Sequence, residues 1–165
     1  MKITAKTFFR TGAQDLCRIH TDTPENEVKR TYLRNLHAFM ARLTREGISD
    51  CSYQALIALS QALETAEAYN ATHNIEILSV YDWLRLAGRK LMKAEVRNTR
   101  VRGELWDKQK PGFSQERWMF WRKRLGDIEK DAGYESQARE VAGKAKDLLE
   151  QLMDRQINEQ EAQHF

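Results

Sequence analysis

Apolar residues recur every three or four positions along most of the chain, which is the period of an amphipathic helix. The first long helix has a clear start, with Thr23 as N-cap, Pro24 at the first helical position and Glu25 beside the positive end of the dipole. We expect it to end at Gly47. Its apolar residues form one stripe, of the kind that faces a protein core: Val28, Tyr32, Leu36, Phe39, Met40 and Leu43.

Two more long helices are predicted between residues 49 and 92. Ser49 or Asp50 caps the first of them, and the chain is expected to break near residues 72–74. Ser79 and Asp82 have the spacing of a capping box for the next helix, in which Gly88 allows a close helix contact. The apolar stripe of the first is Tyr53, Leu56, Ile57, Leu59, Leu63, Ala66 and Tyr69, and that of the second is Val80, Leu84, Ala87, Leu91 and Met92.

Residues 97–113 form a long loop in this interpretation, with turn chemistry at Pro111 and Gly112. Loops of this length, about 17 residues, tend to be functional or mobile. Ser114 then caps a fourth helix that stops near Gly133, and a fifth begins near Ser136. Their apolar residues are Trp118, Trp121, Leu125 and Ile128 in the fourth, and Ala138, Val141, Ala145, Leu148, Leu149 and Leu152 in the fifth.

No strand alternation, internal repeat or low-complexity segment interrupts this pattern. The fold class is therefore all-α: one domain over residues 1–165, a bundle of five or six helices with a long loop between the third and fourth long helices. A chain of 165 residues with 41% apolar content suits a single domain with its own core. A short helix is expected over residues 13–20, and frayed ends over residues 1–12 and 156–165.

Positive charge and tryptophan gather in one part of this helical chain. Residues 85–124 hold thirteen Lys and Arg against four acids, whereas residues 1–84 hold nine against ten and residues 125–165 hold five against ten. Three of the four tryptophans, Trp106, Trp118 and Trp121, lie in the same basic segment. Segregated charge of this kind says more than the whole-chain charge of +3, and it points to an interaction surface here.

The run Trp-Met-Phe-Trp at 118–121 is a second unusual feature. Neighbouring side chains on a helix point about 100° apart, so all four cannot face one core. The two tryptophans share the core face. Either Met119 or Phe120 packs under the 97–113 loop, or the residues form an exposed aromatic patch or the wall of a pocket. The first alternative is favoured because large aromatic residues are mostly buried. In it, Trp106 and Phe113 anchor the loop.

A basic stripe follows the third long helix, where Arg85, Arg89, Lys93 and Arg97 recur at spacing four. Such a stripe, with aromatic residues nearby, could neutralise phosphates and stack bases. Two observations weigh against nucleic acid: no known recognition motif is present, and the acidic last helix offers an internal partner. Its candidate acids are Glu140, Asp147, Glu150 and Asp154.

Catalytic candidates are few. No histidine has the ligand spacing of a zinc site, and no glycine-rich phosphate loop is present. His37, at the edge of its apolar stripe, is the least unlikely acid or base, although a hydrogen-bonded boundary histidine is the commoner case. Glu64 and Glu67 resemble half of a carboxylate metal site without its Glu-x-x-His half. We therefore predict no metal, no cofactor and no catalytic residue.

Cysteine usage and the N-terminus bear on location. Cys17 and Cys51 lie 34 residues apart with no metal spacing around them, and free thiols are favoured over a disulfide. The N-terminus has no signal-peptide core, and no run approaches the ~20 apolar residues of a membrane span. We expect an intracellular protein, cytoplasmic or nuclear, that does not act at a membrane.

Three segments have a distinctive combination of residues: HAFMARLTREGISDCSYQALIALSQALE (37–64), VYDWLRLAGRKLM (80–92) and RGELWDKQKPGFSQERWMFWRKRL (102–125). Together they resemble a fungal family of helical proteins known only as a domain of unknown function. The resemblance covers about residues 28–155 and implies an all-helical intracellular protein without an assigned activity. It also implies that five residues act as one structural unit: Trp106, Pro111, Phe113, Trp118 and Trp121.

The leading hypothesis is a non-enzymatic helical interaction module that binds an unidentified partner protein through the 97–122 surface. The alternative is a small-molecule-binding protein or an enzyme of fungal secondary metabolism, with Trp83, Trp106 and Trp121 around an apolar pocket of at least ~300 Å³. Nucleic-acid binding comes third, and the pattern does not indicate the oligomeric state. The predicted binding residues are Arg97, Arg100, Arg102, Trp106, Lys108, Lys110, Phe113, Trp118 and Trp121.

Overall fold

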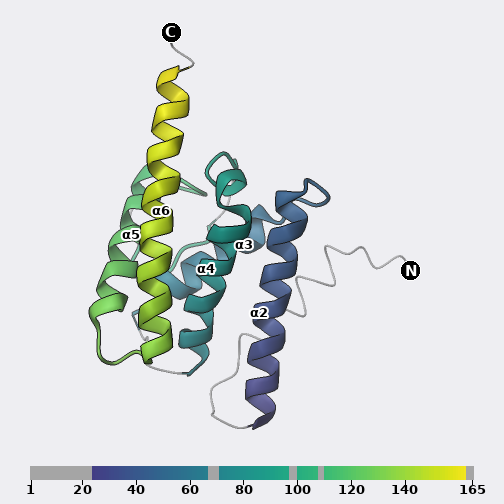
Figure 1. Cartoon of the computed structure of the whole chain (residues 1–165), viewed down its shortest axis with the longest axis vertical. Helices are drawn as coiled ribbons and strands as arrows, with labels where there is room; N and C mark the ends of the chain where they lie inside the picture. Colours follow the sequence, from purple (N-terminus) through teal and green to yellow (C-terminus); the bar gives the residue numbers. More distant parts are fainter. Residues whose placement is uncertain (1–23, 67–70, 97–99, 108–109, 163–165) are drawn as a thin grey trace.

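The structure, a computed structural model, describes residues 24–66, 71–96, 100–107 and 110–162. Within these ranges it contains five α-helices and no strand, which confirms the predicted all-α, single-domain fold (Figure 1). The helices are α2 (Pro24–Arg45), α3 (Ser52–Leu63), α4 (Ala71–Leu91), α5 (Gln115–Lys130) and α6 (Ser136–Ala162).

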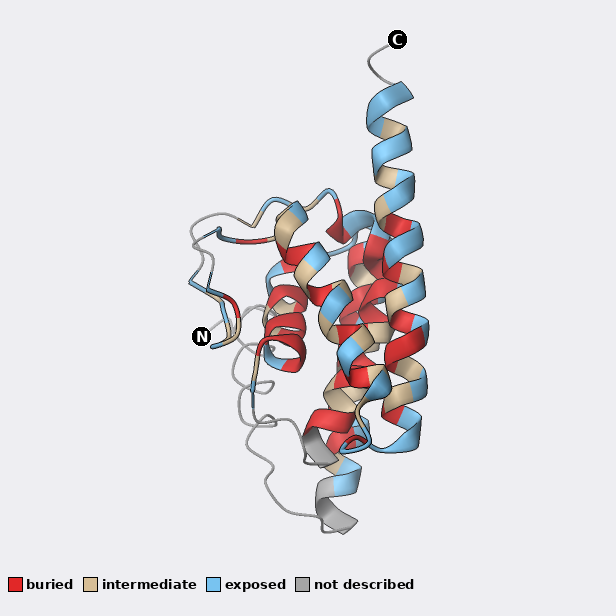
Figure 2. Ribbon diagram, turned by 90° about the vertical axis from the view of Figure 1, so that its left-hand side faces the viewer, coloured by how far each residue is buried: buried red, intermediate tan, exposed pale blue. Residues whose placement is uncertain are grey.

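Helix α4 lies at the centre of the bundle. It packs against α2 on one side and α6 on the other, and α3 lies against it from behind (Figure 1). The chain runs in the same direction along α2, α4 and α6, while α5 runs the opposite way beside α6 (Figure 1). Buried residues gather where these helices meet (Figure 2). The largest side chains of the core, all fully buried, include Trp83, Leu84, Leu91, Trp121 and Leu125.

A glycine sets the close approach of α4 and α6, as the sequence predicted. A Cβ added at Gly88 would come against the side chain of Leu152 on α6. The other buried residues of α6 all precede that point along the helix: Ala138, Ala142, Gly143, Ala145 and Leu149. The tight packing allows the long last helix to follow α4 over most of its length, and α6 then continues beyond the other helices (Figure 1).

The boundaries of α2 agree with the sequence, but the side that it buries does not. The helix begins at Pro24 and ends before Gly47, whose φ of +70° lies in the left-handed region. Of the predicted stripe only Met40 is fully buried, while Val28, Tyr32 and Phe39 are exposed by 70%, 57% and 47%. The stripe prediction was wrong for these three residues.

Satisfied polar side chains explain the different buried face of α2. His37 lies inside because its Nδ1 accepts a hydrogen bond of 3.1 Å from Nε1 of Trp83. Thr44 lies inside because its hydroxyl donates to the carbonyl of Met40 and accepts from the backbone N–H of Cys51. A buried polar group with a partner costs little. A hydrophobicity pattern, however, assigns such residues to the surface.

The break between α3 and α4 comes earlier than predicted. Helix α3 ends at Leu63 and α4 begins at Ala71, so the expected break at residues 72–74 lies inside a helix. The predicted capping box is also wrong, because Ser79 lies within α4 and donates to the carbonyl of Ile75. At the start of α3, the N-cap residue is Cys51 rather than the predicted Ser49 or Asp50, although a carboxylate oxygen of Asp50 accepts from the N–H of the first helical residue.

The last two helices begin where the sequence placed them. The hydroxyl of Ser114 accepts a hydrogen bond from the backbone N–H of Arg117, which confirms it as the N-cap of α5. Helix α5 ends at Lys130, three residues before the predicted stop. Helix α6 continues to Ala162, through most of the segment expected to be frayed. The predicted N-cap Thr23, the frayed residues 1–12 and the short helix over 13–20 lie outside the described residues.

None of the described helices combines the length and apolar character that a membrane span needs.

The buried histidine makes the stability of the fold depend on pH. Burial lowers the pKa of His37 from 6.5 to about 4, against a smaller opposing effect of the Asp82 carboxylate. Between these values the unfolded chain binds a proton that the folded chain does not, so stability falls as the pH is lowered through this window. The full effect of this one group is about 3 kcal/mol.

Replacing His37 by Gln should remove this part of the pH dependence, because the amide oxygen can still accept from Trp83 but does not titrate. Urea unfolding of both proteins between pH 7 and pH 4 measures it. We expect the wild-type protein to lose more stability than His37→Gln over that range. Parallel curves would show that His37 is not the buried neutral group described here.

Candidate interaction site

A buried ion pair joins α5 to the end of α3. Nε and Nη2 of Arg117 donate to the two carboxylate oxygens of Glu64 at 2.7 and 2.9 Å. The side chains of Arg117 and Glu64 are 1% and 0% exposed. Glu64 is also the C-cap residue of α3, where its N–H bonds to the carbonyl of Ser60. Such a pair is expensive to desolvate, so its remaining hydrogen bonds decide whether it holds.

Arg117 uses its other donors to hold both ends of the predicted loop. Nη1 donates to the carbonyl of Gly112 at 3.0 Å, and Nη2 donates to the carbonyl of Val101 at 2.8 Å. Nη2 also reaches the hydroxyl of Ser60 on α3, at 2.8 Å. A single guanidinium therefore connects α3, the start of α5 and two loop positions eleven residues apart.

Glu64 is satisfied from the same directions. Besides Arg117, its carboxylate accepts from Nε1 of Trp121 at 2.8 Å and from the backbone N–H of Gly103 at 2.7 Å. Its carbonyl oxygen accepts from the N–H of Leu105 at 2.9 Å. Both carboxylate oxygens of Glu64 are thus occupied by donors. Glu67, the other residue of the carboxylate spacing noted in the sequence, lies outside the described residues.

Two glycines let the loop come this close. A Cβ added at Gly103 would overlap the backbone of Glu64, and one added at Gly112 would overlap the carbonyl oxygen of Val96. Gly112 also has a φ of +67°, which L side chains rarely adopt. The loop can therefore follow this path only with glycine at these two positions.

Aromatic rings surround the ion pair. Trp106, which is 3% exposed, packs on Phe120 with ring centroids 5.4 Å apart. The guanidinium of Arg117 lies between two indoles, 5.6 Å from the ring of Trp106 and 5.2 Å from that of Trp121. This arrangement confirms that Phe120, the third residue of the Trp-Met-Phe-Trp run, packs under the loop. Met119 in the same run is 49% exposed.

The other loop anchor, Phe113, directly precedes the N-cap of α5. Phe113 is half-buried and stacks on Trp118, with ring centroids 5.1 Å apart and an interplanar angle of 6°. It also meets the edge of Trp121 at 6.0 Å. Four of the residues expected to act as one unit are thus joined directly or through the arginine. The fifth, Pro111, is exposed.

The nine predicted binding residues do not form one exposed surface. Trp106, Trp118 and Trp121 are buried and belong to the scaffold. Arg97 and Lys108 lie outside the described residues. Exposed cations are Arg100, Arg102 and Lys110, and the last of these pairs with Glu116. Of the predicted binding residues that the structure describes, the cations are exposed, whereas the aromatic residues anchor the loop.

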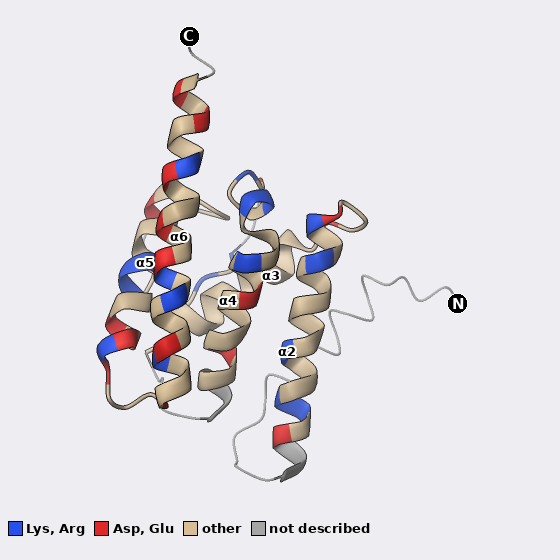
Figure 3. Cartoon of the chain, in the orientation of Figure 1, with Lys and Arg blue, Asp and Glu red and all other residues tan. Residues whose placement is uncertain are grey.

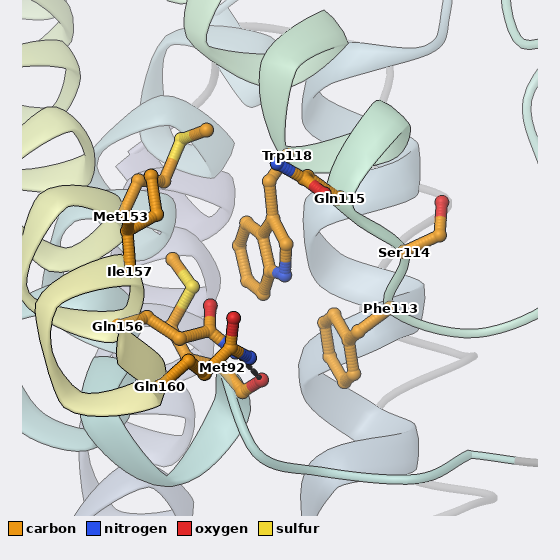
Figure 4. A pocket seen from close by; sticks show the side chains of 9 residues that line it. All are labelled: Met92, Phe113, Ser114, Gln115, Trp118, Met153, Gln156, Ile157 and Gln160. Carbon is orange, nitrogen blue, oxygen red and sulfur yellow. Dashed lines mark hydrogen bonds between the residues drawn. The ribbon is translucent and has the colours of Figure 1, made fainter. Parts of the chain in front are cut away.

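A groove of about 150 Å³ opens beside Phe113, between the start of α5 and the last turns of α6 (Figure 4). Phe113 and Trp118 form one wall, and Met153 and Ile157 of α6 form the opposite wall (Figure 4). Ile157 is 43% exposed. We call this the Phe113 groove; its lining residues are Met92, Phe113, Ser114, Gln115, Trp118, Met153, Gln156, Ile157 and Gln160.

Sequence reasoning missed the α6 side of this groove. Met153 and Ile157 continue the apolar spacing of Leu149 by steps of four, which is the signal that could have found them. Polar neighbours after residue 155 instead suggested a frayed end. The helix persists because Nε2 of Gln156 donates to the carbonyl of Met92 at 3.0 Å, and Glu159 bonds to α4.

Acidic residues of α6 neutralise part of the basic stripe, as expected, but different ones do so. Glu159 accepts from Arg89 at 3.1 Å and from Lys93 at 2.6 Å, and these two hydrogen bonds lower its pKa. Of the four acids proposed for this role, Glu150 bonds to Arg122 on α5, and Glu140 pairs with a lysine of its own helix. Figure 3 shows these charges distributed over α4, α5 and α6.

The tryptophan-lined pocket of the alternative hypothesis is not assembled. Trp83 lies between α2 and α4 and bonds to His37, whereas Trp121 bonds to Glu64 on the other side of the core. The Phe113 groove includes Trp118 instead. Among the described residues, no group of three or more His, Cys, Asp or Glu side chains lies close enough to hold a metal ion.

Comparison of the sequence with protein-family models finds one family, whose function is not known. Residues 4–125 match the model of a family described as "protein of unknown function (DUF3632)". The chain belongs to this family. The matched region includes both Glu64 and Arg117 and the whole 97–113 loop, and it ends within α5. No curated protein and no solved structure matches the chain.

The close approach of the loop to α3 can be tested at its glycine. Gly103→Ala should lower the free energy of unfolding by about 2 kcal/mol or more, because the added methyl group overlaps the Glu64 backbone. Gly126→Ala is the matched control in α5. Its methyl group would meet only Lys146, at an ordinary 3.5 Å, so better helix propensity should raise stability by up to about 1 kcal/mol.

Denaturant unfolding followed by tryptophan fluorescence measures both changes. Opposite signs are expected for the two variants. If Gly103→Ala were as stable as Gly126→Ala, the loop would not lie against the end of α3.

Proposed function

We propose that this chain is a non-enzymatic interaction domain that binds a partner protein at the Phe113 groove, within and beside the predicted 97–122 surface. The groove itself carries the proposal: it is a hollow of mixed polar and apolar lining, with aromatic and aliphatic side chains on its two walls and a partly exposed isoleucine among them, and the described part of the loop before it has exposed cations. The partner contributes one apolar side chain that enters between Phe113 and Ile157.

The size of the groove favours a protein side chain over a small-molecule ligand. Ligand pockets usually enclose about 300–1,000 Å³, whereas this groove holds about 150 Å³. A cavity of roughly that volume accommodates a benzene-sized group. One leucine, methionine or phenylalanine side chain is a matching occupant, and such buried anchors dominate the energetics of many interfaces.

The rim of the groove suggests the chemistry around that anchor. Gln115 and Gln160 supply amide groups that can pair with a partner's main chain. Arg89 on α4 and Lys93, two residues after its end, share the single acid Glu159, which leaves an excess of positive charge next to the α6 wall. We therefore expect a partner segment in which acidic residues flank the apolar anchor.

The competing functions have less support. For nucleic acid, the stripe on α4 is partly engaged, since Arg85 pairs with Asp82 and the next two cations pair with Glu159. For an enzyme of secondary metabolism, His37 is buried against Trp83 and away from the groove. We also propose that the module works inside the cell, in the cytoplasm or nucleus, where Cys51 stays a buried thiol.

A peptide-display selection tests the proposal without a known partner. Peptides selected on the wild-type domain are expected to share an apolar residue with acidic neighbours. Their affinity should fall at least tenfold for Ile157→Asp, which places a charge on the groove wall. Ile48→Asp is the control, because Ile48 is 73% exposed but lies in the turn after α2.

Fluorescence polarisation with the selected peptides gives the affinities. Equal binding to the wild type and to both variants would place the peptides elsewhere on the domain and reject the groove as the binding site. Failure to select any binder would count against the interaction function itself.

A further inference from the structure

Two cations beside the Phe113 groove bond to a single acid of the same chain. Arg89 lies on α4, and Lys93 lies two residues after its end. Nη2 of Arg89 donates to one carboxylate oxygen of Glu159 at 3.1 Å, and Nζ of Lys93 donates to the other oxygen at 2.6 Å. The two cations thus hold one carboxylate between them, with one oxygen for each. We call Arg89 and Lys93 the cation pair.

The cation pair adjoins the groove on both the α4 side and the α6 side. Lys93 follows the groove residue Met92 in the chain, and Glu159 precedes the groove residue Gln160. A third groove residue, Gln156, joins the two sides, because its Nε2 donates to the carbonyl of Met92 (Figure 4). A partner whose apolar anchor enters the groove therefore brings its neighbouring residues close to the cation pair.

The bonds between the cation pair and Glu159 are open to solvent. The side chains of Arg89, Lys93 and Glu159 are 71%, 62% and 36% exposed. Ion pairs of such exposure contribute little to stability, because water competes for both charges. The carboxylate of Glu159 can therefore be exchanged for another carboxylate at the surface, without any opening of the core.

The end of α6 has other contacts with α4 besides Glu159. Gln156 bonds to the carbonyl of Met92 three residues earlier along the helix. Before it, Leu152 packs against α4 where the absence of a side chain at Gly88 makes room. These two contacts remain when the side chain of Glu159 turns away. The α6 wall of the groove therefore persists while the cation pair is free.

We propose that the cation pair is a carboxylate-binding site for the partner protein, and that Glu159 occupies this site as an internal competitor until the partner binds. This inference rests on the proposed function, because it gives a position to the acidic residues expected beside the apolar anchor. The hydrogen bonds from Lys93 and Arg89 lower the pKa of Glu159, so the site favours an ionised carboxylate. An aspartate or a glutamate of the partner presents the same chemical group.

The strength of the internal competitor sets the size of the expected effect. A site that is free only part of the time binds its ligand more weakly in proportion to the free fraction. An exposed ion pair has an equilibrium constant of roughly 1 to 5, and Glu159 bonds to two cations. Removing the competitor should therefore raise the affinity of the site for a free carboxylate by about threefold to tenfold.

A triglutamate peptide tests the carboxylate site separately from the groove, because it has no apolar anchor. Its affinity is measured by NMR titration for the wild type, Glu159→Gln and Glu161→Gln. The last is the matched control: it removes the same charge from an exposed position of α6, but two residues further along, on roughly the opposite side of the helix.

We expect Glu159→Gln to bind triglutamate about threefold to tenfold more tightly than the wild type, and Glu161→Gln to stay close to the wild type. Replacing Arg89 and Lys93 by Gln in the Glu159→Gln variant should remove the gain. Equal affinities of Glu159→Gln and Glu161→Gln would overturn the proposal, because net charge alone would then govern binding.

Peptides selected at the groove give a second measurement. Each is compared with a version whose acidic residues are replaced by amides. Glu159→Gln should bind the acidic version about threefold to tenfold more tightly than the wild type does, and the amide version equally well. Equal changes for both versions would show that Glu159 acts by holding the groove wall, and would overturn the proposal. Absence of any groove peptide, with the expected triglutamate result, would reject the proposed function and support the carboxylate site.

Discussion

The buried pair between Glu64 and Arg117 is the constraint on which the functional part of this molecule depends. Neither charge could be buried alone, because an unpaired ion in the core costs several kcal/mol. Together they bring the end of α3, the start of α5 and the loop between α4 and α5 to one point. All three guanidinium nitrogens and both carboxylate oxygens have partners there, and two indole rings lie 5.6 and 5.2 Å from the guanidinium. The described parts of the connection between α4 and α5, residues 100–107 and 110–113, are thereby fixed to the scaffold.

The groove follows from this arrangement. Arg117 fixes the first turn of α5 to the loop before it, through the carbonyl of Gly112. Phe113, which precedes this turn, and Trp118, which follows Arg117, are therefore held stacked on one another. The opposite wall comes from α6, whose last turns are tied to α4 through Gln156 and Glu159. Two unrelated sets of polar contacts thus position the two apolar walls. The loop contributes its exposed cations, and the ring of Trp106 packs on Phe120 and on the Arg117 guanidinium.

Local signals in the sequence were enough for the presence of the five long helices and for the capping of α5, although not for the start of α4, since helical period and a serine N-cap act over a few residues. They were not enough where distant residues decide. Glu64, at the end of α3, forms its ion pair with an arginine 53 residues away in the sequence, and no local pattern predicts that contact. Similarly, His37 and Thr44 face the core because each has a hydrogen-bond partner there. The face of α2 that contains Val28 and Tyr32, which the pattern assigned to the core, is therefore exposed. The aromatic anchors of the loop were foreseen, whereas the α6 wall was hidden by its polar neighbours.

Hydrogen exchange at two loop amides tests the central role of the ion pair most directly. The N–H groups of Gly103 and Leu105 bond to Glu64, so their protection reports on the loop docking itself. In Arg117→Lys the charge remains but the fork of five donors is lost. Both amides should then exchange at least tenfold faster than in the wild type. The control Arg122→Lys alters only an exposed pair and should leave them unchanged. Wild-type protection of both amides in Arg117→Lys would contradict the account.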